Sequence, residues 1–335
     1  MCASMRITAA SKNPPKLIHV AVGVLEDARG RVLIARRPEH VHQGGLWEFP
    51  GGKVSAGETV EQALRRELQE ELAIAVQSAE PLIRIPHHYA DKSVLLDVYK
   101  VTAFSGQPTG NEGQPVQWVH PMELDQYPFP AANRAILAAL KLPDQMLITG
   151  SFASLDDALR NAERALQSGV RLLQLRCPEL GEHDYAALAR PLAALCQHYQ
   201  AALVCNTSIA QWQQLQLGGL HLNGRQLSRC SERPVPDSVL LGASCHDAHS
   251  VEQANILGVD YLTLSPVEPT ASHPDAEPLG WPRFAELVEL ARVPVYALGG
   301  MRPAHIAQAR SVGAQGIAGI RFGWEAGSAT SVNRR

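Results

Sequence analysis

The spacing of apolar residues changes near the middle of the chain. Before that point, short runs of apolar and β-branched residues alternate with two helical stretches, which predicts an α+β fold with a mixed sheet and helices. Residues 18–25 and 31–35 are such runs, and the turn-forming residues 27–30 between them predict a hairpin. Further strands are expected at residues 82–85 and 94–101, and a short closing helix at residues 133–140.

Beyond residue 146, short apolar runs alternate with segments of helical periodicity. This alternation predicts strands joined by helices, and their number and regular spacing favour a closed, compact (β/α)₈ TIM barrel over an open doubly wound sheet. The expected strands are residues 146–148, 172–175, 202–205, 219–222, 240–243, 261–264, 295–298 and 316–320.

Composition supports two soluble domains. The chain has 335 residues, of which 45% are apolar and 19% charged, so it can bury two cores. All lysines lie at or before Lys141, which marks a boundary near residues 141–146. We expect an N-terminal tail at 1–16, a first domain at 17–141, a second at 146–325 and a C-terminal tail at 326–335.

Charge and hydropathy exclude several classes of partner. The formal net charge is −3, so no basic field is available to bind duplex nucleic acid. No apolar run approaches the length of a membrane helix, and residues 1–16 lack the apolar stretch of a signal peptide, which predicts a cytoplasmic protein. The six cysteines, the first of them Cys2, form no C-x-x-C pair and are expected to be reduced and mostly buried.

The most informative helix is predicted at residues 59–72. Its apolar face is formed by leucines at four-residue spacing, while Glu67, Glu70 and Glu71 lie together on another face beside Arg66. Clustered carboxylates repel one another, and their oxygens are natural ligands for Mg²⁺, or Mn²⁺ in its place. A solvated acidic face is the alternative for three glutamates taken alone.

The surrounding sequence decides between these alternatives. Residues 47–74 resemble the Nudix box, G-x5-E-x7-R-E-hydrophobic-x-E-E-x-G-hydrophobic, with Ala73 in place of the second glycine. The matching residues are Gly52, Glu58, Arg66, Glu67, Leu68, Glu70, Glu71 and Ile74. Residues 17–141 resemble the MutT branch of the Nudix hydrolases, which implies cleavage of oxidised guanine nucleoside triphosphates to the monophosphate and pyrophosphate.

The resemblance implies a role for individual residues. Glu67 is expected to be the general base and a metal ligand, and further metal ligands are expected at Glu70, Glu71, Glu112 and the carbonyl of Gly51. Arg66 is expected to hold a glutamate in place rather than to contact substrate. Substrate contacts are expected from Arg37, Phe49, Lys92 and Asn133, of which the asparagine reads the purine. An exposed hairpin arginine and a core phenylalanine are the alternative interpretations of Arg37 and Phe49.

The second domain resembles the family of thiamine phosphate synthase and the TenI-like thiazole tautomerases. The likeness lies in the segments LLGASCHD at 240–247, PVYALGGM at 294–301 and GAQGIAGI at 313–320. It implies a phosphate cradle at Gly299, Gly300 and Gly319, and an acid/base histidine at His246.

Departures from the family argue against synthesis of thiamine phosphate. The aspartates that hold Mg²⁺-pyrophosphate are missing from residues 206–208 and 221–226, and the lysine is missing from residues 174–179. A thiazole phosphate is therefore the expected ligand, bound either by a tautomerase or by a sensor without catalysis. The sequence leaves open a Nudix substrate from the thiamine pathway, regulation of the hydrolase by the barrel, and the oligomeric state.

Overall fold

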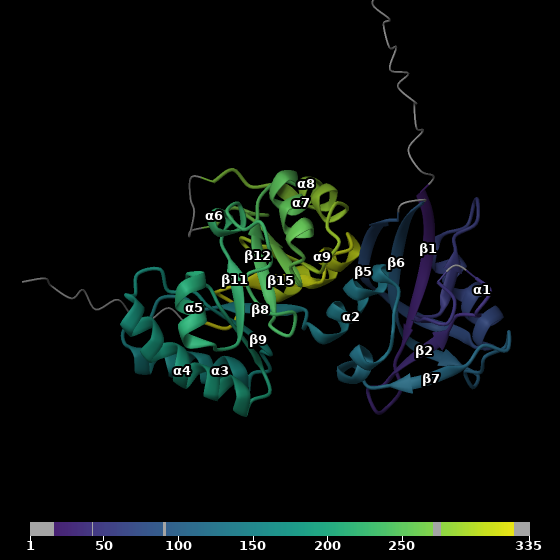
Figure 1. Ribbon diagram of the computed structural model, residues 1–335, viewed down its shortest axis with the longest axis horizontal. Helices are drawn as coiled ribbons and strands as arrows, with labels where there is room; N and C mark the ends of the chain where they lie inside the picture. Colours follow the sequence, from purple (N-terminus) through teal and green to yellow (C-terminus); the bar gives the residue numbers. More distant parts are fainter. Residues whose placement is uncertain (1–16, 42, 90–91, 271–275, 325–335) are drawn as a thin grey trace, which may run out of the picture.

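The computed structural model describes residues 17–41, 43–89, 92–270 and 276–324. The expected tails at 1–16 and 326–335, and Cys2 with the first of them, lie outside these residues. Two bodies lie side by side in Figure 1, with the N-terminal one in purple and blue and the C-terminal one from teal to yellow. No helix within the described residues has the length and apolar character needed to cross a membrane.

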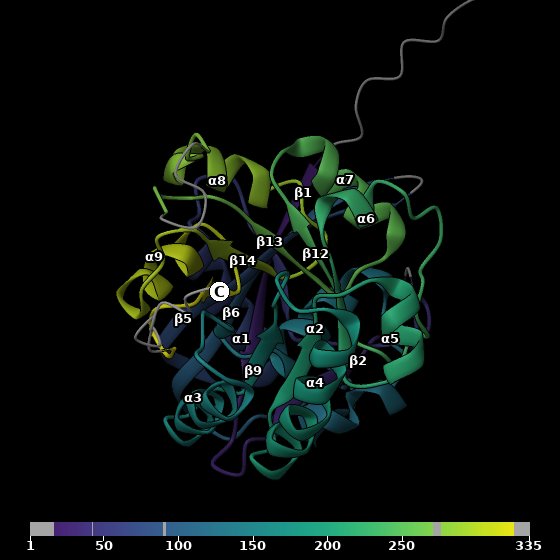
Figure 2. The ribbon, with the colours of Figure 1, turned by 90° about the vertical axis from the view of Figure 1, so that its left-hand side faces the viewer.

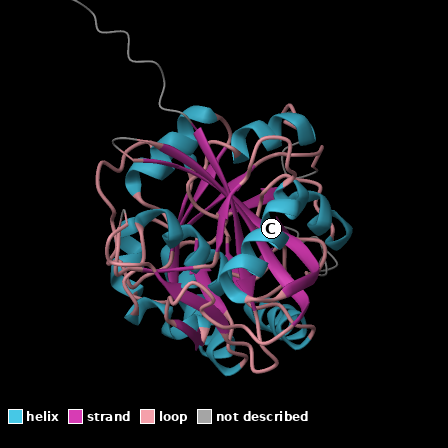
Figure 3. Ribbon diagram, turned by 90° about the vertical axis from the view of Figure 1, so that its right-hand side faces the viewer, coloured by secondary structure: helices cyan, strands magenta, loops and turns pink. Residues whose placement is uncertain are grey.

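The N-terminal body contains two sheets, which confirms the expected mixed fold. One sheet has the order β4-β1-β6-β5, with β1 and β6 parallel and the other pairs antiparallel, and the second has the order β3-β2-β7. Figure 3 views the molecule from the side of this domain, with the strands in magenta. The strands are β1 (Leu17–Leu25), β2 (Val32–Arg36), β3 (Trp47–Glu48), β4 (Gly51–Lys53), β5 (Ala75–His88), β6 (Ser93–Ser105) and β7 (Val116–Val119).

The hairpin predicted from residues 18–35 is wrong in its pairing. The turn forms as expected, with the Gly30 N–H donating to the Asp27 carbonyl at 2.9 Å. After it, however, β1 and β2 enter different sheets and keep only the single bridge between Glu26 and Val32. β1 pairs instead with β4 and β6, and β2 pairs with β3 and β7, all of them strands that only the folded chain brings alongside.

Helix α1 (Val60–Leu72) confirms the helical periodicity. Thr59 is its N-cap, and Gln62 completes a capping box that satisfies the first backbone donors. Its leucines are buried against β1, where a Cβ atom on Gly23 would lie 2.8 Å from Cδ1 of Leu68. The other helical elements of this domain are η1 (Pro121–Gln126), η2 (Ala131–Asn133) and α2 (Arg134–Lys141).

The C-terminal body is the expected closed barrel, and the open-sheet alternative is wrong. Its strands pair in the closed order β10-β11-β12-β13-β14-β15-β8-β9, and all of these pairs are parallel. The strands are β8 (Gln145–Ile148), β9 (Leu172–Leu175), β10 (Ala202–Cys205), β11 (Gly219–Leu222), β12 (Leu241–Cys245), β13 (Tyr261–Leu264), β14 (Val295–Leu298) and β15 (Gly316–Gly319).

Helices surround the barrel, as Figure 2 shows. They bury a continuous apolar layer against the outer faces of the strands. The described cysteines are unpaired, and all but the partly buried Cys230 belong to this core. The helical elements are α3 (Leu155–Gln167), α4 (Glu182–His198), α5 (Ile209–Leu215), α6 (Gly224–Leu227), α7 (Ala248–Leu257), α8 (Gly280–Val288), η3 (Pro303–His305) and α9 (Ile306–Ser311).

The two bodies meet at the N-terminal ends of the barrel strands. The linker between α2 and β8 enters this end, where the Pro143 carbonyl accepts a hydrogen bond from the Tyr296 hydroxyl at 2.6 Å. The buried side chain of Gln315 donates from Nε2 to the carbonyls of Ala139 and Leu142, at 3.0 and 2.7 Å. Beside it, β5 lies against α9 (Figure 1).

Gln315→Leu tests this junction. Leucine keeps the volume but leaves two buried carbonyls without the amide donor, so we expect the free energy of unfolding to fall by about 1–3 kcal/mol. Gln308→Leu on the exposed face of α9 is the control, with an expected change within about 0.5 kcal/mol. Equal denaturation midpoints for the two variants would contradict the structural importance of the Gln315 contacts.

Candidate active site

The glycine loop, residues 49–53 including the short strand β4, lies directly against helix α1. β4 pairs with β1 and thereby presents both glycines to the helix. A Cβ atom on Gly52 would lie 2.1 Å from the carboxyl carbon of Glu67, so a larger residue would displace that carboxylate. Gly51 has a φ of 145°, and its N–H donates to Oε2 of Glu71 at 3.0 Å. The glycines therefore fix two of the carboxylates that the sequence singles out.

Arg66 organises the glutamates on the exposed side of the helix. Its guanidinium donates to both oxygens of Glu58 at 2.9 Å, to Glu67 at 2.8 Å and to Glu70 at 3.3 Å. A further bond at 3.1 Å reaches the carbonyl of Lys53 in β4. The hydrogen bonds from Arg66 lower the pKa of Glu58 to about 2, so that carboxylate is ionised. Arg66 thus ties the helix to the loop through charge-assisted bonds.

Glu71 lies in a half-buried position at the end of the helix. Burial raises its pKa to about 8, opposed by the hydrogen bond from the Gly51 N–H. The negative charges of Glu48, Glu67 and Glu112 raise this pKa further, and a bound cation would lower it.

The donor chemistry of this cluster fits a hard divalent cation. Carboxylate oxygens and a backbone carbonyl are the ligands that Mg²⁺ and Mn²⁺ prefer. Among the residues that the structure describes, however, no three His, Cys, Asp or Glu side chains are already gathered as a closed metal site. Three of the residues expected as ligands, Glu67, Glu70 and Glu71, lie on the same helix. The described side chains do not surround a common point as they would around a bound ion.

Asn133 and Phe49 lie on neighbouring segments of the same domain. Phe49 is buried and stacks on Phe129, with ring centroids 5.6 Å apart. This contact brings the segment 129–133 beside the strand that leads to the glycine loop. Asn133 is 9% exposed, and its side-chain amide makes no hydrogen bond to another described residue. The purine contacts expected from both residues stay predictions, although the buried Asn133 amide is available for a ligand.

Arg37 and Lys92 have protein partners in this structure. Arg37 forms an ion pair with Glu48. The pKa of Glu48 is raised because burial outweighs the opposing effect of the Arg37 guanidinium. The ammonium of Lys92 lies 5.6 Å from the centre of the Tyr89 ring. The substrate contacts expected from the two cations stay predictions.

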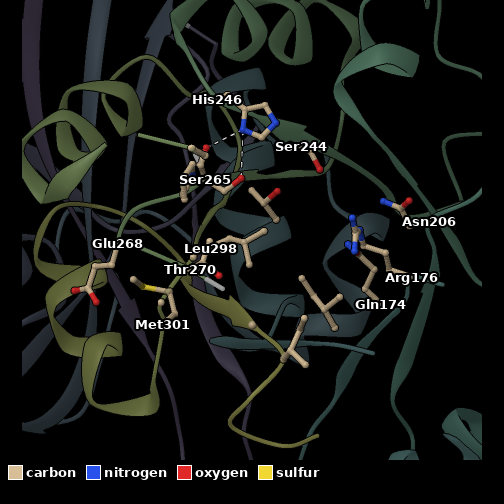
Figure 4. A pocket seen from close by; sticks show the side chains of 18 of the residues that line it. Gln174, Arg176, Asn206, Ser244, His246, Ser265, Glu268, Thr270, Leu298 and Met301 are labelled. Carbon is tan, nitrogen blue, oxygen red and sulfur yellow. Dashed lines mark hydrogen bonds between the residues drawn. The ribbon is translucent and has the colours of Figure 1, made fainter. Parts of the chain in front are cut away.

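The barrel contains a cavity of about 620 Å³ at the C-terminal ends of its strands (Figure 4). Gly299, Gly300 and Gly319 all line it, as the sequence resemblance implies. A Cβ atom on Gly299 would lie 2.8 Å from Cα of Pro266, and one on Gly300 would lie 2.7 Å from Cβ of Glu268. The loop after β14 therefore requires glycine at both positions.

His246 also lines the cavity, above Ser265 in Figure 4. Its Nδ1 lies 2.7 Å from the carbonyl oxygen of Ser265, which can only accept, so Nδ1 carries a proton. In the neutral ring this leaves Nε2 without a proton and able to accept one. The geometry therefore presents His246 as a base, and its catalytic role stays a prediction.

Several polar cavity residues were not singled out from the sequence. His221 in β11 is buried, with Nε2 2.9 Å from the Ser244 hydroxyl and Nδ1 3.1 Å from the Tyr261 hydroxyl. Burial lowers the pKa of His221 to about 3, so the ring is neutral. Nε2 of Gln174 and Oγ1 of Thr263 are buried without a hydrogen-bond partner. The sequence signal that could have identified these residues is the presence of polar side chains at alternate positions of the barrel strands, because alternate positions face the inside of a barrel.

The charges lining the cavity differ from those of a pyrophosphate site. Asn206 lines it where the family has its first aspartate motif, and Pro178 lies in the segment that lacks the lysine. The described positive charges at the cavity are the guanidinium groups of Arg176, Arg302 and Arg321. Figure 4 places Arg176, Gln174 and Asn206 together, across the cavity from Glu268 and Met301.

Comparisons with known proteins divide the chain in the same way. A model of the NUDIX domain matches residues 21–139, and a model described as thiamine monophosphate synthase matches residues 145–322. The 8-oxo-dGTP diphosphatase of Escherichia coli is 37% identical over 126 residues, which cover 38% of this chain and 98% of that protein. The CTP pyrophosphohydrolase of the same organism is 37% identical over 124 residues, 37% of this chain and 91% of that protein.

The barrel has its own relatives. A putative thiamine-phosphate synthase 2 of Aquifex aeolicus is 34% identical over 181 residues, which cover 54% of this chain and 97% of that protein. Each half of the chain thus corresponds to nearly the whole of a separate protein. The protein belongs to the Nudix hydrolases through its N-terminal domain and to the thiamine monophosphate synthase family through its barrel.

Proposed function

We propose that the N-terminal domain hydrolyses 8-oxo-dGTP to 8-oxo-dGMP and pyrophosphate in a Mg²⁺-dependent reaction. The observation that carries this proposal is the clustering of two carboxylates of the motif at the glycines, with Glu67 packed against Gly52 and Glu71 accepting a hydrogen bond from the Gly51 N–H at 3.0 Å. Such a cluster suits a highly anionic triphosphate only when a divalent cation lies between them. The similar 8-oxo-dGTP diphosphatase of E. coli supports the choice of substrate.

Different residues of the proposed site would bind the cation and accept the proton. Glu70, Glu71, Glu112 and the Gly51 carbonyl would hold Mg²⁺, which supplies positive charge to the phosphate oxygens. Glu67 is held between Arg66 and Gly52 and would accept a proton from the attacking water. Arg66 orients that carboxylate through their ion pair at 2.8 Å.

Asn133 would recognise the base. Its nearly buried amide offers a donor and an acceptor, which can pair with two neighbouring groups on the edge of an oxidised purine. The CTP pyrophosphohydrolase of E. coli is as similar as the 8-oxo-dGTP diphosphatase, so CTP is the second candidate substrate. A substrate panel that includes CTP and a thiamine-pathway pyrophosphate separates these choices.

For the barrel, we propose binding of a thiazole phosphate without synthesis of thiamine phosphate. Backbone N–H groups around Gly299, Gly300 and Gly319 can hold one phosphate without a charged side chain. The aspartates and the lysine that hold Mg²⁺-pyrophosphate in the family are absent from the corresponding segments of this chain. His246 would act as the acid/base of a tautomerase through its free Nε2.

Glu67→Gln tests the catalytic base. We expect pyrophosphate release at saturating Mg²⁺ to fall at least ~100-fold, because glutamine cannot accept the proton. Glu61→Gln, on the exposed first turn of the same helix, should keep the wild-type rate. Chelation should abolish the wild-type activity, and Mg²⁺ or Mn²⁺ should restore it. Near-normal turnover by the Glu67 variant would refute its assignment as base, and activity in chelator would refute the metal-dependent mechanism.

Asn133→Ala tests recognition of the base. We expect kcat/KM for 8-oxo-dGTP to fall by roughly 5- to 150-fold, corresponding to about 1–3 kcal/mol for a lost buried hydrogen-bonding group. The kcat/KM for unmodified dGTP should fall less. Equal losses for the two nucleotides would make Asn133 structural, and a wild-type preference for CTP would reject 8-oxo-dGTP as the substrate.

Calorimetry of the full chain with the thiazole phosphate tests the barrel. We expect saturable binding and no formation of thiamine phosphate when the pyrimidine pyrophosphate is added. His246→Asn should keep the affinity and lose tautomerase turnover, since only the acid/base group is removed. Absence of binding, or measurable synthesis, would contradict the proposal. Turnover that survives in the His246 variant would reject its catalytic role.

A further inference from the structure

The loop between β6 and β7 satisfies the C-terminal end of helix α1. The last four carbonyls of a helix lack partners within it. In α1 the Ala73 N–H donates to Gln69, at a left-handed φ of 56°. The three carbonyls that follow, those of Glu70, Glu71 and Leu72, all accept hydrogen bonds from this loop. The helix that carries the catalytic glutamates is therefore capped by a distant segment of chain.

Asn111 and Gln114 supply the specific contacts. Asn111 donates from Nδ2 to the Glu70 carbonyl at 2.8 Å and from its backbone N–H to the Glu71 carbonyl at 2.9 Å. Gln114 donates from Nε2 to the same Glu71 carbonyl at 2.9 Å. Its Oε1 accepts from the backbone N–H of Glu112, also at 2.9 Å. One side-chain amide thus joins the backbone of Glu71 to that of Glu112.

This bridge joins the backbones of the two residues whose carboxylates are expected as metal ligands. Glu112 is exposed, and no described contact of its own side chain holds it near the helix. Its position relative to Glu71 therefore depends on the backbone of the loop. The side-chain amides of Asn111 and Gln114 and the backbone N–H groups of Thr109 and Asn111 attach that backbone to the end of the helix. Of these groups, the Gln114 amide bonds both Glu71 and Glu112.

We propose that Gln114, assisted by Asn111, is a positioning residue that sets Glu112 against Glu71 and thereby determines the affinity of the site for its divalent cation. The inference rests on the proposed metal-dependent function. Gln114 touches neither substrate nor cation in this role. It acts through the backbone of the two glutamates, as outer hydrogen-bond partners do in metal sites generally.

Gln114→Leu removes both hydrogen bonds at nearly constant volume. We expect the dissociation constant for Mn²⁺, measured on the full chain by titration calorimetry without nucleotide, to rise about tenfold. The Mg²⁺ concentration for half-maximal activity should rise by a similar factor, while kcat at saturating Mg²⁺ stays within about twofold of wild type. A merely structural residue would instead lower kcat at every Mg²⁺ concentration.

Gln117→Leu is the matched control. Gln117 is an exposed glutamine in β7 whose amide donates to the Tyr127 hydroxyl at 2.7 Å, and it makes no bond to α1. We expect its Mn²⁺ affinity to equal that of the wild type. The thermal midpoint of each variant in chelator reports whether the fold is intact. If Gln114→Leu does not fold, Asn111→Ala, at an exposed position, should still weaken Mn²⁺ binding two- to threefold.

The outcomes separate this inference from the proposed function. Mn²⁺ binding of equal strength in the wild type and in folded Gln114→Leu would overturn the positioning role and leave the hydrolase proposal standing. The same holds for equal binding by Asn111→Ala if the first variant does not fold. Absence of Mn²⁺ binding by the wild-type chain would overturn both. Weakened binding with recovery of kcat at high Mg²⁺ supports the inference.

Discussion

The N-terminal domain is organised around a helix that must hold several carboxylates close together. Glu71 is half-buried, and the Gly51 N–H and the capped end of the helix hold it in place, while the Arg66 guanidinium holds Glu67 and Glu70. Together these contacts maintain an arrangement of like charges that a bound cation would stabilise.

The cavity of the barrel combines neutral buried polar groups with the guanidinium groups of three arginines. His221 is held without charge by burial, and its ring nitrogens face hydroxyl groups. The amide of Gln174 and the hydroxyl of Thr263 are buried without partners within the described chain. Such groups are costly unless they are hydrogen-bonded, so they favour a ligand that brings hydrogen-bond donors and acceptors.

The sequence predicted the features that depend on local patterns. The helix at residues 59–72 and all barrel strands follow from periodicity, and Gly51, Gly52 and Glu67 follow from a linear motif. The separation of β1 from β2 could not be predicted in this way, since it depends on which distant strand each one meets. The same is true of the ion pair between Arg37 and Glu48 and of the bridge made by Gln114, because both join segments that only the folded chain brings together.

The position of the linker has a consequence for how the two domains cooperate. Pro143 and Gln315 join the Nudix domain to the N-terminal ends of the barrel strands, whereas the cavity opens at their C-terminal ends. The barrel wall and its packed interior therefore stand between the two sites. A small molecule released at one site would reach the other through bulk solvent, where it mixes with the free pool. Covalent linkage thus gives the domains equal abundance without direct transfer of an intermediate.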